Sequence, residues 1–497
     1  MLQGLATALY CACQTGLLLY SSHRWPMLVS RPLPSAGATP AWPEGGEPAV
    51  LVQLPVRDEP TVVARLVAAV AALDWPADRL CMQLLDDSDD PGAIQAGAAA
   101  VTAARSRGIA ATHVRRGART GFKAGALEHG LALDDSPFVA VFDADFLPAP
   151  DFLRRLMPRF SDEHVGLVQA RWGHLNRDVS ALTRAQAVML DAHLLVEHPW
   201  RQRTGRFFNF NGTAGVWRRS AIESAGGWSH DTLTEDLDLS YRAQLAGWRF
   251  VFDPSVVVPA ELPESMAAFR SQQHRWAKGA LQTARKLLPR ILRAPLPWWV
   301  RLEAVVHLTA NAGYPLLLAL AVLLAPVLFT VRTVSLPCLI MLQAGIVLLG
   351  TLPVILFLVR GQQLAGRSAR HIMADVPGAM MLCAGLSWHL AGAVAAGLWG
   401  PVGQFVRTPK TGTVVAGARS GQAAGMSGRE TDAGPARGIP ELVLAASLAL
   451  LACAAFAAGR PAAMPFLLVM SAGLAWVGLA MRPAAIVQVP AEVLRRR

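Results

Sequence analysis

Acidic and aromatic side chains recur in four short motifs between two apolar parts of the chain. In order, they are Asp86-Asp87, Asp143-Ala144-Asp145, Thr234-Glu235-Asp236 and Gln272-Gln273-His274-Arg275-Trp276. Together they predict one site with a nucleotide cradle, a divalent metal, a base and an acceptor platform. Each motif alone is weak, because Asp87-Ser88-Asp89 and Asp236-Leu237-Asp238 also read Asp-x-Asp. Their order, spacing and structural setting carry the prediction.

Asp143 and Asp145 are the candidate metal ligands. They follow the apolar run 138–142, which is typical of a buried strand. Two carboxylates at a strand end suit a hard ion such as Mg²⁺ or Mn²⁺, which also takes substrate phosphates as ligands. The alternative is a carboxylate that caps the following helix, but Asp151 suits that cap better.

Asp86, Asp87 and Lys123 are the candidate contacts to the nucleotide. The two carboxylates follow a second expected strand, 81–85, which favours a nucleoside contact over a solvated acidic turn. Lys123 lies in the basic, glycine-containing stretch 119–125. A phosphate contact and an ordinary exposed lysine both remain open for it.

Glu235 and Asp236 are the candidate catalytic residues. They begin the amphipathic stretch 237–246, and acidic residues also favour a helix N-terminus, so both interpretations hold together. A base at that place would deprotonate a sugar hydroxyl as it attacks.

The fourth motif predicts the acceptor platform. Helical spacing puts Gln272, Arg275 and Trp276 on nearly one face. Trp276 offers a flat apolar wall for a sugar ring, and a membrane-interface anchor is the alternative.

The region 49–290 predicts an α/β domain. Apolar runs of strand length alternate with helical stretches, which is typical of a parallel sheet. In such sheets ligands bind outside the carboxyl ends of strands, where Asp86, Asp87, Asp143 and Asp145 are expected.

The rest of the chain predicts a membrane protein. Apolar residues make up 53% and charged residues 16% of the sequence. The net charge of +11 comes largely from Arg and Lys that flank apolar segments, which favours a lipid bilayer over nucleic acid as the partner. Five spans are expected, with the N-terminus outside: residues 2–20, 305–330, 336–359, 442–458 and 463–481.

Residues 373–400 are apolar but interrupted by glycine and proline. Both flanking loops are basic and thus expected in the cytoplasm, so we interpret this segment as interfacial or re-entrant. A sixth full span is the alternative. The resulting division is an anchor (1–22), a catalytic domain (49–290), a hairpin (303–360), an interfacial segment with a gating-like loop and flexible linker (366–438), a second hairpin (439–482) and a basic tail (483–497).

Residues from about 55 to 410 resemble the processive family-2 glycosyltransferases, the cellulose-synthase-like group. The four motifs above match it, and so do four further stretches: Arg119-Thr120-Gly121-Phe122-Lys123-Ala124-Gly125, Gln169-Ala170-Arg171-Trp172, Phe207-Phe208-Asn209-Phe210-Asn211-Gly212-Thr213-Ala214-Gly215 and Phe405-Val406-Arg407-Thr408-Pro409-Lys410. The last resembles the loop that closes over the nucleotide in this family. The family's usual asparagine near the first strand is replaced, in Val56-Arg57-Asp58-Glu59.

The resemblance implies a Rossmann-like GT-A fold and an inverting, metal-dependent transfer of a sugar from a nucleotide sugar. It assigns the base to Asp236, the acceptor platform to Trp276, and the metal and diphosphate site to Asp143 and Asp145. Arg275 and Lys123, with Thr408 and Lys410 from the loop, are expected to contact the diphosphate.

The expected product is a β-linked polysaccharide, made from UDP-glucose in a bacterial inner membrane with the catalytic domain in the cytoplasm. The growing polysaccharide or a glycolipid is the expected acceptor, and an accessory export protein is a further candidate partner. Two rival functions are a membrane enzyme that adds one sugar to a lipid and a transporter without enzymatic activity. The ordered acidic site argues against the transporter.

Overall fold

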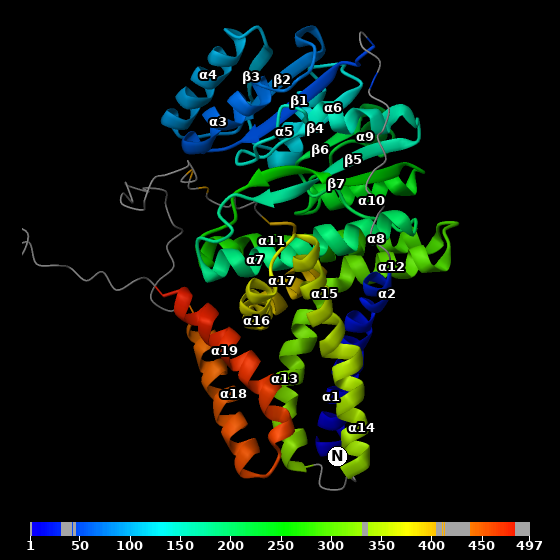
Figure 1. The fold of residues 1–497 in the computed structure, drawn as a ribbon, viewed down its shortest axis with the longest axis vertical. Helices are drawn as coiled ribbons and strands as arrows, with labels where there is room; N and C mark the ends of the chain where they lie inside the picture. The colour runs from blue at the N-terminus through cyan, green and yellow to red at the C-terminus, as the bar shows by residue number, and fades with distance from the viewer. Residues whose placement is uncertain are drawn as a thin grey trace, which may run out of the picture.

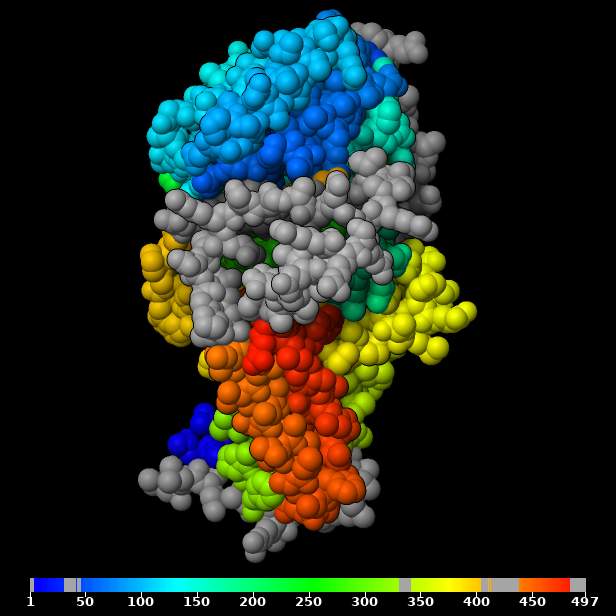
Figure 2. All heavy atoms as spheres, turned by 90° about the vertical axis from the view of Figure 1, so that its left-hand side faces the viewer, coloured from blue at the N-terminus to red at the C-terminus, as the bar shows by residue number. Residues whose placement is uncertain are grey.

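The computed structural model describes residues 2–30, 42, 46–330, 336–403, 410, 412 and 438–482. Three layers follow one another along the long axis: an α/β domain, a layer of helices lying across the axis, and a bundle of helices along it (Figure 1). In the space-filling view the α/β domain forms a broad head on a narrower helical stalk (Figure 2).

The α/β domain is built on a seven-stranded sheet in the order β3-β2-β1-β4-β6-β5-β7. The strands are β1 Val50–Val56, β2 Leu80–Asp86, β3 Ala110–Arg115, β4 Phe138–Val141, β5 Val165–His174, β6 Gly215–Arg218 and β7 Arg249–Ala260. The expected strands 81–85 and 138–142 are therefore present. The sheet is mixed rather than fully parallel, because β6 runs antiparallel to both β4 and β5.

Helices cover both faces of the sheet, and side chains alternate between two cores. Val50, Val52 and Leu54 of β1 pack in one core, while Leu51 packs in the other. Burial on both faces explains the near-continuous apolar runs in β1 and β4. The helices of this domain are α3 Pro60–Ala71, α4 Pro91–Arg105, α5 Phe122–Leu131, α6 Phe152–Leu156, α9 Arg219–Ser224 and α10 Glu235–Leu245.

The middle layer connects this domain to the bundle. It contains α7 Ala181–Ala192, α8 His198–Arg203, α11 Met266–Arg293 and α12 Trp298–Thr309. A π-helical turn, His193–Glu197, joins α7 to α8. α11 contacts α12 of its own layer, α10 of the α/β domain on one side and α17 on the other side. It therefore touches both neighbouring parts of the molecule.

The bundle contains α1 Leu2–Ser22, α2 Trp25–Val29, α13 Gly313–Thr330, α14 Leu336–Ile346, α15 Leu352–Leu364, α18 Ile439–Ala457 and α19 Met464–Ala480. Two further helices, α16 Ala369–Gly385 and α17 Ser387–Trp399, lie across the long axis between the middle layer and the bundle (Figures 1 and 2). Among the described residues, four helical stretches are long and apolar enough to cross a membrane: Trp298–Phe329, Met341–Leu364, Ile439–Ala457 and Pro461–Ala480. The chain is therefore described as a membrane protein.

The structure adds detail to two parts of the expected topology, the segment 373–400 and the N-terminal anchor. α16 and α17, which cover the segment 373–400, meet at a bend of 51°, the shape of a broken span or a re-entrant segment. The expected N-terminal anchor is the helix α1, which packs along α13 but is not among the four stretches above. The five-span arrangement stays a prediction.

Candidate functional site

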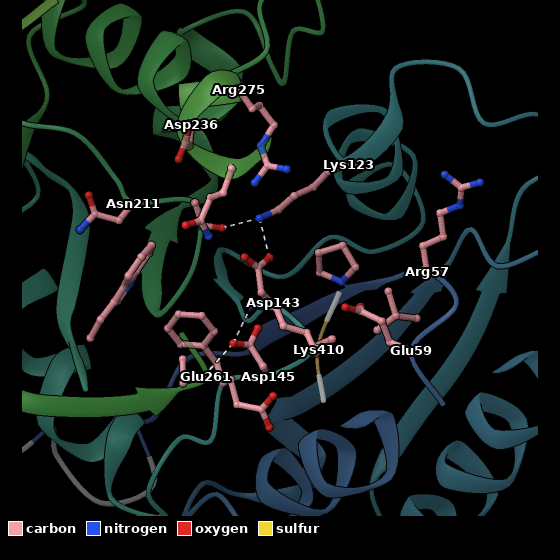
Figure 3. A pocket seen from close by; sticks show the side chains of 18 of the residues that line it. Arg57, Glu59, Lys123, Asp143, Asp145, Asn211, Asp236, Glu261, Arg275 and Lys410 are labelled. Atoms are coloured by element: carbon pink, nitrogen blue, oxygen red, sulfur yellow. Dashed lines mark hydrogen bonds and ion pairs between the residues drawn. The ribbon is translucent and has the colours of Figure 1, made fainter. Parts of the chain in front are cut away.

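A cavity of about 180 Å³ opens where the ends of β1, β2 and β4 face α10 and α11. Its lining brings together most of the predicted site residues: Asp87, Lys123, Asp143, Asp145, Glu235, Asp236, Gln272, Arg275, Trp276 and Lys410. Figure 3 shows charged side chains converging on it from several elements. Thr408 lies outside the described residues.

Among the predicted site residues that the structure describes, Asp86 is the one that does not line the cavity. Its carboxylate is buried and accepts hydrogen bonds from His113 Nε2 at 2.8 Å and from the backbone N–H of Ser88 at 2.9 Å. His113 is on β3, the neighbouring strand. The strand-end position was predicted correctly, but the side chain pairs within the sheet and is not placed to contact a nucleoside.

Asp87 does line the cavity, beside Arg57, Glu59 and Arg119. Arg116 holds its carboxylate with two nitrogens, Nε at 3.0 Å and Nη2 at 2.5 Å. Such a two-point contact fixes both the position and the plane of a carboxylate. Asp87 is therefore a pre-oriented acceptor at this end of the cavity.

Asp58 explains the departure from the family's usual asparagine. Its φ is +47°, a left-handed conformation that asparagine and aspartate tolerate better than most residues. Asp58 Oδ1 accepts hydrogen bonds from the backbone N–H groups of Asp89 and Asp90, each at 2.9 Å. Its carboxylate thus joins the loops that follow β1 and β2.

Asp143 and Lys123 form the centre of the cavity. Lys123 Nζ lies 2.5 Å from Asp143 Oδ1 and 2.9 Å from the carbonyl oxygen of Gly212. Burial disfavours the charge of Lys123, but Asp143, Glu235 and Asp236 together outweigh that effect and raise the pKa of the ammonium. Lys123 is therefore a buried cation held by a carboxylate, which decides against the ordinary exposed lysine.

Asp145 is 1% exposed and lies beneath Asp143. Its Oδ2 accepts a hydrogen bond from Lys410 Nζ at 2.8 Å and another from the backbone N–H of Glu261 at 3.0 Å. Burial raises the pKa of the Asp145 carboxyl, and Lys410 opposes that rise. These contacts are to β7 and to Lys410, so Asp145 does not cap the helix that follows it.

The two carboxylates fit a divalent metal that shares its coordination with substrate phosphates. Asp145 Oδ1 is buried and has no hydrogen-bond partner among the described residues, and the Asp143 side chain is 37% exposed. Among the residues that the structure describes, no group of three or more His, Cys, Asp or Glu side chains is placed to hold a metal. A metal here would need oxygen ligands from phosphate, as Mg²⁺ commonly does.

Asp236 and Glu235 begin α10 directly beside this pair. Asp236 Oδ1 accepts the backbone N–H of Leu237 at 2.8 Å. Burial, followed by the charge of Glu235, raises the pKa of Asp236 to about 7, and Lys123 opposes the rise. A carboxylate with a pKa near neutrality is well suited to general-base catalysis.

Gln272, Arg275 and Trp276 reach the cavity from α11. The predicted helical face is therefore confirmed. Trp172, at the end of β5, adds a second indole to the lining. The cavity thus has a charged part near Asp143 and a part with aromatic walls, and Asp236 belongs to the same lining.

The comparisons with known proteins agree with this geometry. Residues 138–359 match the family model described as glycosyl transferase family group 2. Over 250 residues the chain is 45% identical to glucomannan 4-beta-mannosyltransferase 1 of Oryza sativa subsp. japonica, covering 50% of this chain and 48% of that protein. It is also 45% identical over 250 residues to glucomannan 4-beta-mannosyltransferase 2 of Arabidopsis thaliana, covering 50% and 47%. The chain spans about half the length of the curated relatives it matches.

A solved structure shares the fold. The mannosyltransferase from Pyrobaculum calidifontis in complex with GDP-Man and Mn²⁺ superposes with a TM-score of 0.50 at 20% identity, covering 80% of this chain and 99% of that chain. The fold is therefore GT-A-like, as the sequence predicts, and the match to the family model over residues 138–359 lies within the same part of the chain. The relatives above are plant proteins, so they support the family but not the expected bacterial membrane.

Sequence reasoning missed two residues that shape the site. Glu261 follows β7 and contacts Asp145, so the rule that found Asp143 would have found it had β7 been predicted. Gly212 has a φ of +81°, and a Cβ there would lie 2.9 Å from Asp236 Oδ2 and 3.5 Å from Lys123 Nζ. Its place in the Phe207–Gly215 motif was the available signal.

We predict that transfer activity rises with pH through about 7. Asp236 must be unprotonated to accept a proton, and its pKa is raised to about 7, so the base is present above that pH and lost below it. The measurement is kcat against pH under saturating substrates. Lys123→Met should move the acid limb to higher pH, because a cation that favours the carboxylate is removed. An acid limb near pH 4 in the unmodified protein would contradict this assignment.

We predict that Gly212→Ala lowers kcat about 10- to 100-fold by displacing Asp236. Its left-handed φ should also cost about 1 kcal/mol of stability. Gly108→Ala is the matched control, because Gly108 has a φ of +84° with no atom within 4 Å of an added Cβ. Thermal melting and kcat separate the two effects, and equal kcat losses in both variants would refute the displacement.

Proposed function

We propose that this protein is a membrane-embedded inverting glycosyltransferase that extends a β-linked mannan or glucomannan with mannose from GDP-mannose. The observation that carries the proposal is the position of Asp236, in one cavity with Asp143, Asp145 and Trp276. The relatives are glucomannan mannosyltransferases, which supports mannose as the sugar, and GDP-mannose takes the place of the UDP-glucose expected from the family resemblance.

The reaction follows from the placement of these residues. The acceptor's terminal sugar stacks on Trp276, with a hydroxyl directed at Asp236. Asp236 removes the hydroxyl proton as the oxygen attacks the anomeric carbon and the bond to the diphosphate breaks. A single in-line displacement turns an α-linked donor into a β-linked product.

Cationic side chains offset the charge that develops on the departing diphosphate. Arg275, Lys123 and Lys410 all line the cavity, so protein cations are available for this role. Asp143 and Asp145 would hold Mn²⁺ or Mg²⁺, which supplies further positive charge to the leaving group when bound. Lys123 also keeps Asp143 oriented toward that position.

The proposal includes the membrane arrangement expected from the sequence. The α/β domain lies in the cytoplasm, where Asp236 meets the nucleotide sugar, and the polymer leaves along the helical bundle. Addition of one sugar to a lipid is the second candidate function, and product length distinguishes it. The acceptor face of α11, with Gln272 and Trp276 in the cavity, favours a polymer.

We expect purified protein with Mn²⁺ to incorporate radiolabel from GDP-mannose into a polymer that β-mannanase degrades. UDP-glucose alone should give no polymer. EDTA should abolish incorporation until Mn²⁺ or Mg²⁺ is restored, because two carboxylates, Asp143 and Asp145, are too few ligands to keep the metal from a chelator. Thin-layer and size-exclusion analysis of the product is the measurement. Polymer from UDP-glucose alone would overturn the donor assignment, and label confined to a lipid extract would favour the second function.

We expect Asp236→Asn to lower kcat by about 10²- to 10⁴-fold, the usual contribution of general-base catalysis. The amide keeps the shape of the carboxylate but not its basicity, so GDP binding should be retained. Asp151→Asn makes the same chemical change at the start of α6, outside the cavity, and should leave kcat unchanged. Turnover of Asp236→Asn within tenfold of the control would reject Asp236 as the base.

A further inference from the structure

Lys410 lies on the carboxylate that a metal would use. Its Nζ donates to Asp145 Oδ2 at 2.8 Å, and both side chains are largely buried, 15% and 1% exposed. Figure 3 shows Lys410 at the same edge of the cavity as Asp143 and Asp145. The charges of Glu59 and Asp143 also act on the Lys410 ammonium. In this state the protein thus places its own cation on Oδ2 of a carboxylate whose other oxygen, Oδ1, is open to Mn²⁺ or Mg²⁺.

The backbone two residues after Lys410 is attached to the catalytic domain. Gly412 donates its N–H to Glu261 Oε2 at 3.2 Å. The other oxygen of Glu261, Oε1, is paired with Arg65 of α3. Gly412 has a φ of +68°, and a Cβ there would lie 3.0 Å from Thr61 Cβ. Gly412 therefore fits closely against the start of α3 and cannot be replaced without strain.

Glu261 contacts both Asp145 and Gly412, which lies two residues after Lys410. Its backbone N–H donates to Asp145 Oδ2, the same oxygen that Lys410 reaches. Its side chain accepts the N–H of Gly412. Glu261 itself is buried, 5% exposed, so its position is fixed by β7 and Arg65. One residue thus sets both where Asp145 stands and where the segment carrying Lys410 is attached.

We propose that Glu261 is a positioning residue that seats Gly412, so that Lys410 pairs with Asp145 until metal binding at the same carboxylate, together with nucleotide, displaces its ammonium toward the diphosphate. The inference rests on the proposed function, because it requires a metal-bound diphosphate at Asp143 and Asp145. Its physical basis is charge. Two cations on one buried carboxylate repel each other, whereas the added negative charge of the diphosphate gives the ammonium a new partner.

The exchange predicts opposite effects of one substitution on two affinities. Lys410→Met should raise the affinity for Mn²⁺ alone roughly fivefold, because the metal no longer competes with an ammonium. The same variant should lower the affinity for nucleotide in the presence of Mn²⁺, because a diphosphate contact is lost. The full chain in detergent is titrated with Mn²⁺ by electron paramagnetic resonance, and then with GDP and with UDP at saturating Mn²⁺.

Gly412→Pro tests the seat without changing any charge. Proline removes the N–H that Glu261 accepts and cannot adopt a positive φ. It should change both affinities in the same directions as Lys410→Met, and it should have no effect in a Lys410→Met background. Gly108→Pro is the matched control, because it also removes a donating N–H at a positive φ, in the turn before β3.

The outcomes separate the two proposals. Lower or unchanged Mn²⁺ affinity in Lys410→Met would overturn the exchange, and a Gly412→Pro variant that binds like the unmodified protein would overturn the seat. These titrations need neither sugar nor acceptor. Failure to transfer mannose would therefore count against the proposed function alone, and the nucleotide that binds the unmodified protein serves as the probe.

Discussion

Lys123 lies between two pairs of carboxylates, and the cavity depends on it. Its ammonium contacts Asp143 at 2.5 Å, and the charges of Glu235 and Asp236 also act on it. Without this cation, the carboxylates of Asp143, Asp145, Glu235 and Asp236 would repel one another. Burial, and after it the charge of Glu235, raises the pKa of Asp236 to about 7. With Lys123 present, the rise stops near neutrality, where a base is useful.

The helix α11, which carries Trp276, contacts both the α/β domain and the bundle. On one side, Gly279 of α11 lies so close to Thr234, two residues before Asp236, that a Cβ would come within 2.5 Å of the Thr234 side chain. On another side, Arg270 of α11 pairs with the buried Glu441 of α18 at 3.0 Å. The helix that carries Trp276 is thus fixed against the base and against an apolar hairpin. A shift of the bundle against the α/β domain would move the platform relative to Asp236.

Much of the α/β domain could be predicted, because its signals are local. The buried run before Asp143, the acidic start of α10 and the helical face of α11 each depend on neighbouring residues in the sequence. β6 could not be predicted to run antiparallel, since its direction appears only in its pairing with β4 and β5, which are distant in the sequence. The contact of Lys410 with Asp145 joins residues 265 positions apart and could be expected only from family resemblance. Asp86 was misplaced because a strand end does not determine which side a carboxylate faces.

The three Asp-x-Asp sequences show what decides a function when spelling does not. Asp238 of the third is fully buried, and its oxygens pair with Arg242 at 2.7 Å and Lys286 at 2.9 Å. Asp89 of the first lies at the surface beside Arg57. In the second, Asp145 Oδ1 is buried and has neither a hydrogen bond nor an ion pair among the described residues, whereas Asp238 Oδ1, which also lacks a hydrogen bond, has Lys286 at 2.9 Å. A buried acceptor without a donor is costly, and a bound cation removes that cost. The unsatisfied oxygen, rather than the motif, therefore favours Asp145 as the carboxylate that the proposed metal would bind.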